Sequence, residues 1–410
     1  MRITKAPAGG TVRAVPSKSM AHRLIIAGAL SKEENRILIN GSSEDIEATK
    51  ECMQKIQKAY ASSFPVSLNV RESGSTLRFL VPVAAALGLK AEFVMEGRLP
   101  ERPMGQLLEQ LRQHGVEWSQ TDRNVLQIKG QLQGGIFELP GNQSSQFVTG
   151  LLMALPLIGQ NSEVRVLGEL ESRPYVDMTL DVLKKSGITI FEDEPNRFIV
   201  PGGQKYRLKG EYDAGGDWSS AAFWLAAGAA AGSGITVQGL DPESLHGDKA
   251  VVNILEEMGA EMGWTGNDLT ARPHSLRSLI IDVRNTPDLV PAIAVAACRA
   301  SGKTVIMNAE RLRLKESDRL HSITEVLKSL GAMVNERPDG LEIFGGYKLH
   351  GGKVSSFNDH RIAMMAACLR GQTPEGPDGD IIIEGAEAVN KSYPGFWEDY
   401  RLLGGKTEEI

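Results

Sequence analysis

The chain has 410 residues, of which 41% are hydrophobic and 23% are charged, a balance typical of a soluble globular protein rather than a disordered one. The length exceeds that at which a single hydrophobic core usually keeps growing, so we expect two domains. A formal net charge of -6 argues against nucleic acid or an anionic membrane as a partner, because both require a broad basic face. Any anion binding is therefore local.

Cysteine usage and the absence of targeting signals indicate a cytoplasmic protein. No start of signal-peptide type and no uninterrupted apolar stretch of membrane-spanning length is found. The His and Cys residues show no metal-ligand spacing, and no P-loop or dinucleotide fingerprint occurs, so we expect neither a metal nor a cofactor. Buried, reduced thiols are expected for three widely separated residues, Cys52, Cys298 and Cys368.

An internal repeat is the strongest structural signal. Six times a polar or charged residue opens a run of small and apolar residues, at intervals of about 70 residues apart from a shorter first one. Because such runs are apolar on most faces, each predicts a buried helix. The runs open near Ser17, Gly74, Ser144, Asp217, Pro287 and Asn358.

A second, amphipathic helix follows most of these runs and ends in Leu-x-x-x-Gly, where the glycine is a helix stop signal. Short alternating segments come next, such as Ile188 to Phe191 and Phe198 to Val200, and these predict antiparallel strands. The first repeat is shorter than the others, because the second repeat begins early. We therefore expect that a strand or hairpin is missing from the first repeat. The helix ends are Leu111 to Gly115, Leu183 to Gly187, Leu255 to Gly259 and Leu327 to Gly331.

Three repeats per domain is the simplest partition, and a composition shift at Tyr212 to Gly216 falls after the third repeat. We therefore expect an inserted domain, residues 16–212, and a discontinuous domain, residues 1–15 plus 213–410. The N-terminal strand, Arg2 to Val15, would belong to the second. If the buried helices of each domain run parallel, their N-termini share one face, and two such faces opposed across a hinge make a positive cleft.

Cations gather at the predicted helix starts, although the helix dipole disfavours them there. Lys18, Arg23, Arg78 and Arg361 are examples, and the densest charge cluster is Arg311 to Arg319. An anion bound between them explains this clustering. For the segment Ser17 to Arg23 taken alone, the alternative that it is only a solvated, charged helix start remains open.

Seven motifs, in order along the chain, resemble the 5-enolpyruvylshikimate-3-phosphate synthase family. The resemblance implies an α/β fold of two domains, each of three inverse α/β repeat units around buried parallel helices. It also implies that the enolpyruvyl group of phosphoenolpyruvate is transferred to the 5-hydroxyl of shikimate-3-phosphate, with release of phosphate, in aromatic amino acid biosynthesis. The motifs are Lys18-Ser19-x-x-x-Arg23, Ser144-Ser145-Gln146, Ser172-Arg173-Pro174-Tyr175, Gly216-Asp217-x-Ser219-Ser220-Ala221, Lys315-Glu316-Ser317-Asp318-Arg319, Asp359-His360-Arg361 and Lys391-Ser392-Tyr393-Pro394.

The family motifs imply a ligand set and an acid and base. In the family pattern Asp288 resembles the base and Glu316 the acid, and both belong to the discontinuous domain, on the phosphoenolpyruvate side. Shikimate-3-phosphate would meet Lys18, Ser19, Arg23, Ser144, Ser145, Gln146, Ser172, Tyr175, Asp288 and Lys315. Phosphoenolpyruvate would meet Lys18, Gly74, Arg102, Gln146, Arg319, Arg361 and Lys391.

Three features depart from the commoner family pattern, and one of them is Arg311, which stands where several relatives have Asn or Glu and whose ligand role is left open. Glu72-Ser73-Gly74-Ser75-Thr76 replaces Asn-Ala-Gly-Thr-Ala beside the phosphoenolpyruvate site, which leaves the response to glyphosate, the herbicide that targets this family, open. Because the first repeat is shortened, it is left open whether Asp45 makes any contact at the site. Two alternatives stand beside this reading: the sister enolpyruvyl transferase acting on UDP-N-acetylglucosamine, and a non-catalytic anion-binding repeat protein. We expect small-molecule partners and a monomer.

Overall fold

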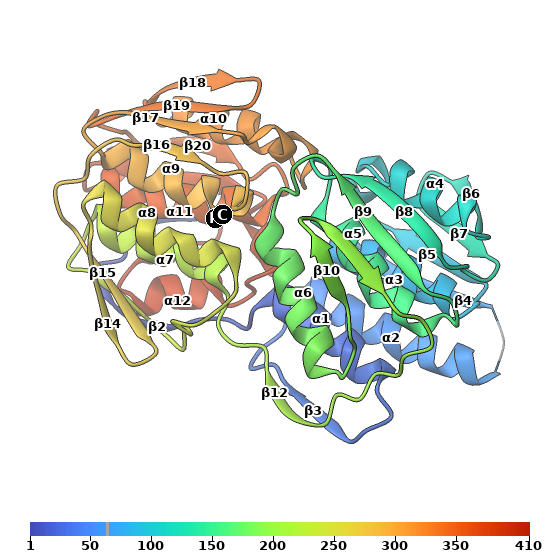
Figure 1. The fold of residues 1–410 in the computed structure, drawn as a ribbon. Helices are drawn as coiled ribbons and strands as arrows, with labels where there is room; N and C mark the ends of the chain where they lie inside the picture. Colours follow the sequence, from blue (N-terminus) through green and yellow to red (C-terminus); the bar gives the residue numbers. More distant parts are fainter. Residues whose placement is uncertain (63–64) are drawn as a thin grey trace. The chain divides into compact units, whose positions relative to one another are not determined.

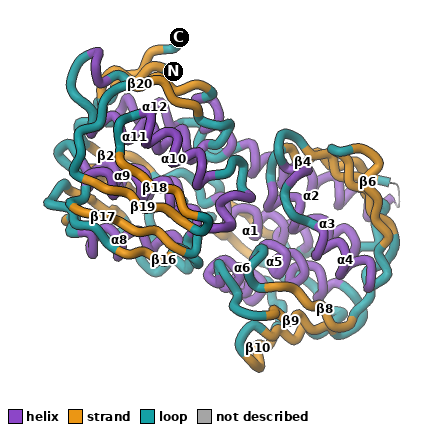
Figure 2. Tube along the Cα trace, turned by 90° about the horizontal axis from the view of Figure 1, so that it is seen from above, coloured by secondary structure: helices purple, strands orange, loops and turns teal. Residues whose placement is uncertain are grey.

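The computed structural model describes residues 1–62 and 65–410. The chain forms two compact units, one made of Lys18–Ala214 and one made of Met1–Ser17 together with Gly215–Ile410 (Figure 1). Each unit has its own hydrophobic core. In each unit the strands lie outside the helices (Figure 2).

The contiguous unit, Lys18–Ala214, is built on three buried helices, and a more exposed helix follows each of them. Ser73 and Ser144 cap two of the buried helices by accepting bonds from Thr76 N and Gln146 N, as expected for serine at this position. The buried helices are α1 (Lys18–Leu30), α3 (Gly74–Ala86) and α5 (Ser145–Ala154); the others are α2 (Glu44–Ser62), α4 (Gly105–Gln113) and α6 (Arg173–Lys185).

Two four-stranded sheets and one two-stranded sheet are described in this unit. The two-stranded sheet belongs to the first repeat, which confirms that a hairpin is missing there. The orders are β4 (Val66–Arg71), β5 (Ala91–Met95), β7 (Val125–Lys129), β6 (Glu117–Asp122); then β8 (Gly135–Pro140), β9 (Ser162–Leu167), β11 (Arg197–Val200), β10 (Phe191–Glu194); and β3 (Asn35–Leu38) with β12 (Gly210–Asp213).

The discontinuous unit repeats the arrangement around buried helices α7, α9 and α11. Asp217 and Asp359 cap α7 and α11 by accepting bonds from Ser220 N and Arg361 N, and a short 3-10 turn carrying Asp288 leads into α9. The helices are α7 (Trp218–Ala230), α8 (Val251–Met258), α9 (Val290–Arg299), α10 (Arg319–Ser329), α11 (His360–Leu369) and α12 (Phe396–Leu402), with the turns η3 (Gly247–Ala250), η4 (Pro287–Leu289) and η8 (Ala386–Lys391).

Three four-stranded sheets are described in this unit. Each pairs its first two strands in parallel and the rest antiparallel, and the two four-stranded sheets of the other unit follow the same rule. The orders are β2 (Gly10–Arg13), β13 (Ile235–Gln238), β15 (Asp268–Arg272), β14 (Glu261–Thr265); then β16 (Ile280–Asp282), β17 (Gly302–Met307), β19 (Gly340–Gly345), β18 (Met333–Arg337); and β20 (Gly352–Ser355), β21 (Ile381–Glu384), β1 (Arg2–Lys5), β22 (Lys406–Glu408).

The N-terminal segment is not the single strand expected over Arg2 to Val15. It forms β1 and β2, which join two different sheets. The chain bends between them at Gly9 and Gly10, whose φ angles of 134° and 128° are disfavoured for a residue with a side chain. The start of the chain lies beside its end, since Arg2 is paired with Glu408 (Figure 1).

The predicted helix stops are confirmed. Each of the four Leu-x-x-x-Gly segments ends a helix at a glycine with positive φ, the left-handed conformation that closes a helix. One strand prediction was too early: β10 begins at Phe191, because Ile188 N–H still bonds back to Leu183 O at 2.9 Å. The glycine φ angles are Gly115 90°, Gly187 71°, Gly259 103° and Gly331 84°.

Two further findings concern membranes and thiols. Within residues 1–62 and 65–410, no helix combines the length and the hydropathy needed to cross a bilayer. Cys52, Cys298 and Cys368 are all free and buried, as predicted. Burial raises the pKa of Cys52 and of Cys298 to about 12, so both thiols are protonated at neutral pH.

Candidate functional site

The discontinuous unit gathers several predicted residues around one carboxylate. Asp288 stands on η4, immediately before buried helix α9. Its Oδ1 lies 3.1 Å from Lys315 Nζ and 2.8 Å from Arg319 Nη1. Its Oδ2 lies 3.4 Å from Arg361 Nη2. Three cations from two parts of the sequence, Lys315 and Arg319 in one motif and Arg361 in another, therefore converge on one aspartate.

Arg319 is the centre of this cluster. It is the first residue of α10, and its side chain is only 1% exposed. Besides Asp288, its guanidinium donates to Glu316 Oε2 at 2.7 Å and to Asp359 Oδ2 at 2.7 Å. Burial lowers the pKa of Arg319, but the three carboxylates outweigh it and raise that pKa above its usual value. Arg319 is thus a fixed positive charge.

Arg361 and one further predicted cation, Lys391, lie near the start of α11. Arg361 is 5% exposed and donates from Nη1 to the Asp288 carbonyl oxygen at 3.3 Å. Lys391, at the end of η8, donates from Nζ to the Asn358 carbonyl oxygen at 2.7 Å. Asn358 precedes the cap Asp359 and has a φ of 55°. Lys391 therefore contacts the strained loop that immediately precedes α11, the helix whose first turn contains Arg361.

Electrostatics decide the protonation state of Asp288. Burial acts to raise the pKa of this carboxyl, but Lys315, Arg361 and Arg319 together hold the pKa well below its usual range. The carboxylate is consequently ionised at neutral pH. While all three cations face it, Asp288 is a weak proton acceptor.

In the contiguous unit, the predicted residues of α1 are engaged with neighbouring helices. Lys18 Nζ lies 2.8 Å from Oδ2 of Asp45 on α2. Arg23 is 2% exposed and donates to the carbonyl oxygens of Ser19 at 2.6 Å and Tyr175 at 2.7 Å. Its guanidinium also lies 5.2 Å from the Phe79 ring centre. Arg23 thereby ties the start of α1 to α6.

Gly74 lies under two guanidinium groups. A Cβ atom on Gly74 would lie 2.8 Å from Nη1 of both Arg102 and Arg78, so a side chain there would displace the ends of both arginines. Arg78 donates to Gln146 Oε1 at 2.8 Å, and Gln146 donates to Ser75 Oγ at 2.9 Å. The first turns of α3 and α5 are thus joined beneath the Arg102 side chain.

The remaining predicted residues stand at helix starts of the same unit. Ser144 is the cap of α5, and Ser145 is its first residue and is 6% exposed. Ser172 precedes α6 in a left-handed conformation, with φ of 57° and ψ of 36°. Tyr175 lies in the first turn of α6 and accepts the Arg23 bond through its carbonyl oxygen. The ligand-binding roles of these residues stay predictions.

Sequence reasoning did not place three residues of these clusters in the ligand sets: Asp45, Arg78 and Asp359. Asp359 is 0% exposed and holds both Arg319 and the backbone N–H of Arg361. Its position at a helix start signals only a cap, and its second role depends on α10 lying beside it. The sequence did carry a signal for Arg78. A cation near the start of a buried helix needs a partner, so Arg78 could have been assigned to the cluster.

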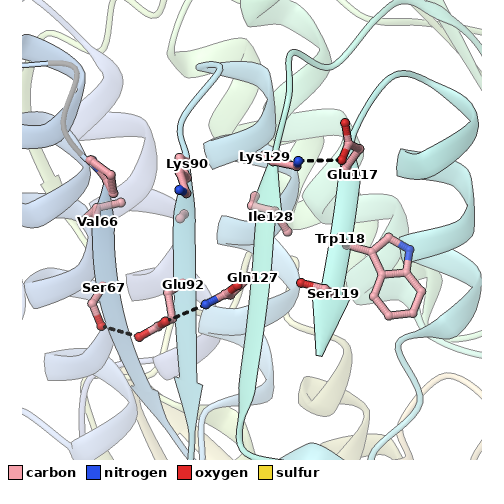
Figure 3. Close-up of a pocket in the computed structure, with 12 residues that line it drawn as sticks. Val66, Ser67, Lys90, Glu92, Glu117, Trp118, Ser119, Gln127, Ile128 and Lys129 are labelled. Atoms are coloured by element: carbon pink, nitrogen blue, oxygen red, sulfur yellow. Dashed lines mark hydrogen bonds and ion pairs between the residues drawn. The ribbon is translucent and has the colours of Figure 1, made fainter. Parts of the chain in front are cut away.

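A groove of about 550 Å³ lies on the outer face of the sheet β4, β5, β7, β6, and it contains none of the predicted site residues. Its polar side chains bond to one another: Gln127 donates to Glu92 at 3.0 Å, and Lys129 pairs with Glu117 at 2.8 Å (Figure 3). The candidate functional site is therefore the set of helix starts, not this groove.

Comparisons with known proteins agree with the motifs. The family model described as EPSP synthase (3-phosphoshikimate 1-carboxyvinyltransferase) matches residues 4–400. A 3-phosphoshikimate 1-carboxyvinyltransferase of Clostridium kluyveri is 43% identical over 98% of this chain and 96% of its own length. The protein of that name from Methanothrix thermoacetophila is also 43% identical, over 99% of this chain and 98% of its own length.

Solved structures agree as well. An EPSP synthase from Acinetobacter baumannii superposes with a TM-score of 0.76 at 25% identity, covering 98% of both chains. The enolpyruvyl transferase NikO from Streptomyces tendae, at 17% identity, has a TM-score of 0.76 over 99% of this chain and 97% of its own, which supports the fold alone. The predicted two-domain α/β fold is confirmed. Because the family model covers nearly the whole chain, the chain belongs to the EPSP synthase family, as its motifs predicted.

Proposed function

We propose that this chain transfers the enolpyruvyl group of phosphoenolpyruvate to the 5-hydroxyl of shikimate-3-phosphate, giving 5-enolpyruvylshikimate-3-phosphate and phosphate. The observation that carries the proposal is the pair of carboxylates, Asp288 and Glu316, held by the two terminal nitrogens of Arg319. The reaction needs one group that accepts a proton from the hydroxyl and one that delivers a proton to the methylene carbon. Two carboxyl groups in unlike surroundings can supply both.

Asp288 is the base in this proposal. It is ionised in the free protein, and its three cations make it weakly basic. Ligand phosphates and carboxylates attract the same cations, so binding draws Lys315 and Arg361 partly away from Asp288. With fewer cations facing it, the pKa of Asp288 rises and the carboxylate becomes able to take the hydroxyl proton.

Glu316 is the acid. It shares Arg319 with Asp288, and its side chain is 15% exposed. It donates a proton to the methylene carbon of phosphoenolpyruvate as the hydroxyl adds to the neighbouring carbon. When the resulting tetrahedral intermediate breaks down, Glu316 takes back a proton from the methyl carbon and the departing phosphate takes the proton held by Asp288, which restores both groups.

The binding residues are those that the motifs imply. Lys18, Arg102, Arg319, Arg361 and Lys391 supply the positive charge that two adjacent anionic ligands need if they are not to repel each other. The shikimate-3-phosphate ligands are Lys18, Ser19, Arg23, Ser144, Ser145, Gln146, Ser172, Tyr175, Asp288 and Lys315, and phosphoenolpyruvate also meets Gly74 and Gln146. The protein works as a monomer in the cytoplasm, where thiols such as its three cysteines stay reduced.

The experiment is an assay of phosphate release from phosphoenolpyruvate, run with shikimate-3-phosphate and, separately, with UDP-N-acetylglucosamine. Release with the first acceptor alone supports the proposal. Release with the second would identify the sister transferase. Binding of ligands without any release, unchanged in Asp288→Ala and Glu316→Gln, would identify a non-catalytic anion-binding protein.

A further inference from the structure

A chain of buried hydrogen bonds outside the predicted ligand set links three helices of the contiguous unit. Nδ1 of His22 on α1 lies 2.7 Å from Oγ1 of Thr49 on α2. Thr49 Oγ1 in turn lies 2.7 Å from Oγ1 of Thr76 on α3, and Thr76 donates its hydroxyl to Ser73 Oγ at 2.7 Å. All four residues are 0% exposed. We refer to His22, Thr49, Thr76 and Ser73 together as the hydroxyl chain.

The direction of the hydroxyl chain follows from its hydrogens, because a threonine hydroxyl has only one to donate. The hydrogen of Thr76 goes to Ser73, so the 2.7 Å contact between the two threonines needs the hydrogen of Thr49. The alternative acceptor for Thr49, the Asp45 carbonyl oxygen, lies farther away at 3.4 Å. With the Thr49 hydrogen used, the bond between His22 and Thr49 must be donated by the imidazole Nδ1–H.

His22 is therefore a neutral imidazole with its proton on Nδ1. Burial and the nearby charges of Lys18 and Arg23 lower the pKa of His22 well below its usual value, so the ring is uncharged at neutral pH. Within the described part of the chain, Nε2 has no hydrogen-bond partner. An apolar side chain would avoid the cost of that buried nitrogen, so what this histidine contributes is the Nδ1–H donor.

One end of the hydroxyl chain lies a helical turn below the proposed ligand Lys18. His22 follows Lys18 by four residues, and Thr49 follows Asp45 by four, so each pair shares one face of its helix. The ion pair between Lys18 and Asp45, at 2.8 Å, and the bond between His22 and Thr49 are thus successive links between α1 and α2.

The other end of the hydroxyl chain holds the residue before Gly74. Ser73 Oγ accepts both the N–H of Thr76, at 3.3 Å, and its hydroxyl, at 2.7 Å, and Gly74 follows as the first residue of α3. Ser73 and Thr76 stand where the commoner family pattern has alanine, which has no hydroxyl. The hydroxyl chain therefore uses the segment by which this sequence departs from that pattern.

We propose that the hydroxyl chain positions the phosphoenolpyruvate site, and that His22 is a positioning residue whose Nδ1–H fixes Gly74 on α3 relative to Lys18 on α1. The inference rests on the proposed function, in which Lys18 and Gly74 are phosphoenolpyruvate ligands. Arg23, a proposed shikimate-3-phosphate ligand, has other bonds, to the Ser19 and Tyr175 carbonyl oxygens and to Thr179 Oγ1. Loss of the hydroxyl chain should therefore weaken the binding of phosphoenolpyruvate selectively.

The first test compares Thr76→Val, which keeps the shape and removes the hydroxyl, with the wild-type chain. The KM for phosphoenolpyruvate is expected to rise about tenfold, the factor that a buried hydrogen bond is typically worth, and the KM for shikimate-3-phosphate to stay within about twofold. Thr76→Ser retains a hydroxyl and should keep both KM values close to those of the wild type. An unchanged KM for phosphoenolpyruvate in Thr76→Val, an equal rise in both KM values, or a Thr76→Ser variant as impaired as Thr76→Val would overturn the proposal.

The matched control is Ser186→Ala. Ser186 belongs to the same unit, is 0% exposed and donates its hydroxyl to the Val182 carbonyl oxygen at 2.7 Å, but it lies at the C-terminal end of α6. This variant also loses a buried hydrogen bond, so it reports the effect of lost stability alone. Both KM values should stay at the wild-type level. A rise in the control equal to that in Thr76→Val would also overturn the proposal.

The second test needs neither turnover nor a folded Thr76→Val variant. Nitrogen NMR of the wild-type protein distinguishes the two neutral tautomers of histidine, and the signals of His22 are identified by their loss in His22→Asn. A proton on Nδ1 is expected, and a proton on Nε2 overturns the proposal. If the wild-type chain shows no turnover, the proposed function fails; calorimetry then decides the inference, and a wild-type affinity of Thr76→Val for phosphoenolpyruvate overturns it.

Discussion

Asp288 and Glu316 are held by opposite terminal nitrogens of Arg319, at 2.8 Å and 2.7 Å. The two proposed proton-transfer groups are therefore fixed relative to each other by a side chain that is itself 1% exposed. Asp359 fixes that side chain in turn, through the Nε bond of 2.7 Å. Three carboxylates thus hold the guanidinium of Arg319 in one orientation.

Asp288→Asn is expected to lower kcat for phosphate release by a factor of about 10² to 10⁴, the usual contribution of a positioned general base. Asparagine has a similar size but cannot accept the proton. Steady-state assays of phosphate release measure the change. A kcat within threefold of wild type would contradict the assignment of Asp288 as the base.

The stability contributed by Asp288 should depend on pH. Its pKa is depressed in the folded state and is about 3.9 in the unfolded chain. Its ionised form therefore stabilises the protein fully above about pH 5, and this contribution is lost as the pH falls through 4 towards the depressed value. Urea unfolding of wild type and Asp288→Asn should show a constant difference in free energy from about pH 5 to 7 and a smaller one near pH 3. A pH-independent difference would contradict the depressed pKa.

Gly74→Ala is expected to raise the KM for phosphoenolpyruvate by about tenfold, which corresponds to about 1.4 kcal/mol. The added Cβ pushes against the ends of the Arg102 and Arg78 side chains, which can move, so stability should change by less than about 1 kcal/mol. Gly105→Ala is the matched control: Gly105 also begins a helix, and a Cβ there meets nothing within 4 Å. Equal KM values for the two variants would contradict the prediction.

Arg78→Ala should destabilise the contiguous unit. Arg78 is 4% exposed and donates to Gln146 Oε1 and, at 3.0 Å, to the Pro103 carbonyl oxygen. Its removal leaves two shielded acceptors without donors, at a cost of about 2–4 kcal/mol in the free energy of unfolding. The control Arg36→Ala removes an exposed ion pair with Glu211 and should cost less than about 1 kcal/mol. Chemical denaturation of both variants distinguishes the two effects.

The three cysteines should resist thiol reagents in the folded protein. All are buried, and burial holds the pKa of Cys52 and Cys298 at about 12, so almost no reactive thiolate is present at pH 8. An aromatic disulfide reagent should label no thiol rapidly in the native state and three after denaturation. Rapid labelling of a native thiol would show that its burial is incomplete.

Much of the fold could be predicted because its signals are local. Capping residues such as Asp217 and glycine stops such as Gly259 mark helix ends within a few residues of sequence. The short first repeat was visible for the same reason. The division of the N-terminal segment between two sheets was not, since β1 and β2 obtain their partners from strands hundreds of residues later.

The site was predicted less completely. The cations and the two carboxyl groups proposed to transfer protons followed from the family motifs, but their partners did not. Asp45 and Asp359 are acidic residues at helix starts, where the helix dipole alone explains them. The contact of Asp359 with Arg319 depends on how α10 and α11 pack, and the sequence carries no local signal of that.

The placement of β1 between β21 and β22 has a consequence for biosynthesis. During synthesis β1 obtains neither neighbour until β21 (Ile381–Glu384) and β22 (Lys406–Glu408) have been made, whereas Lys18–Ala214 is contiguous and can complete its core beforehand. The strand β1 must therefore stay unpaired while the other unit folds. Loss of the three residues Lys406–Glu408 alone would expose one edge of β1.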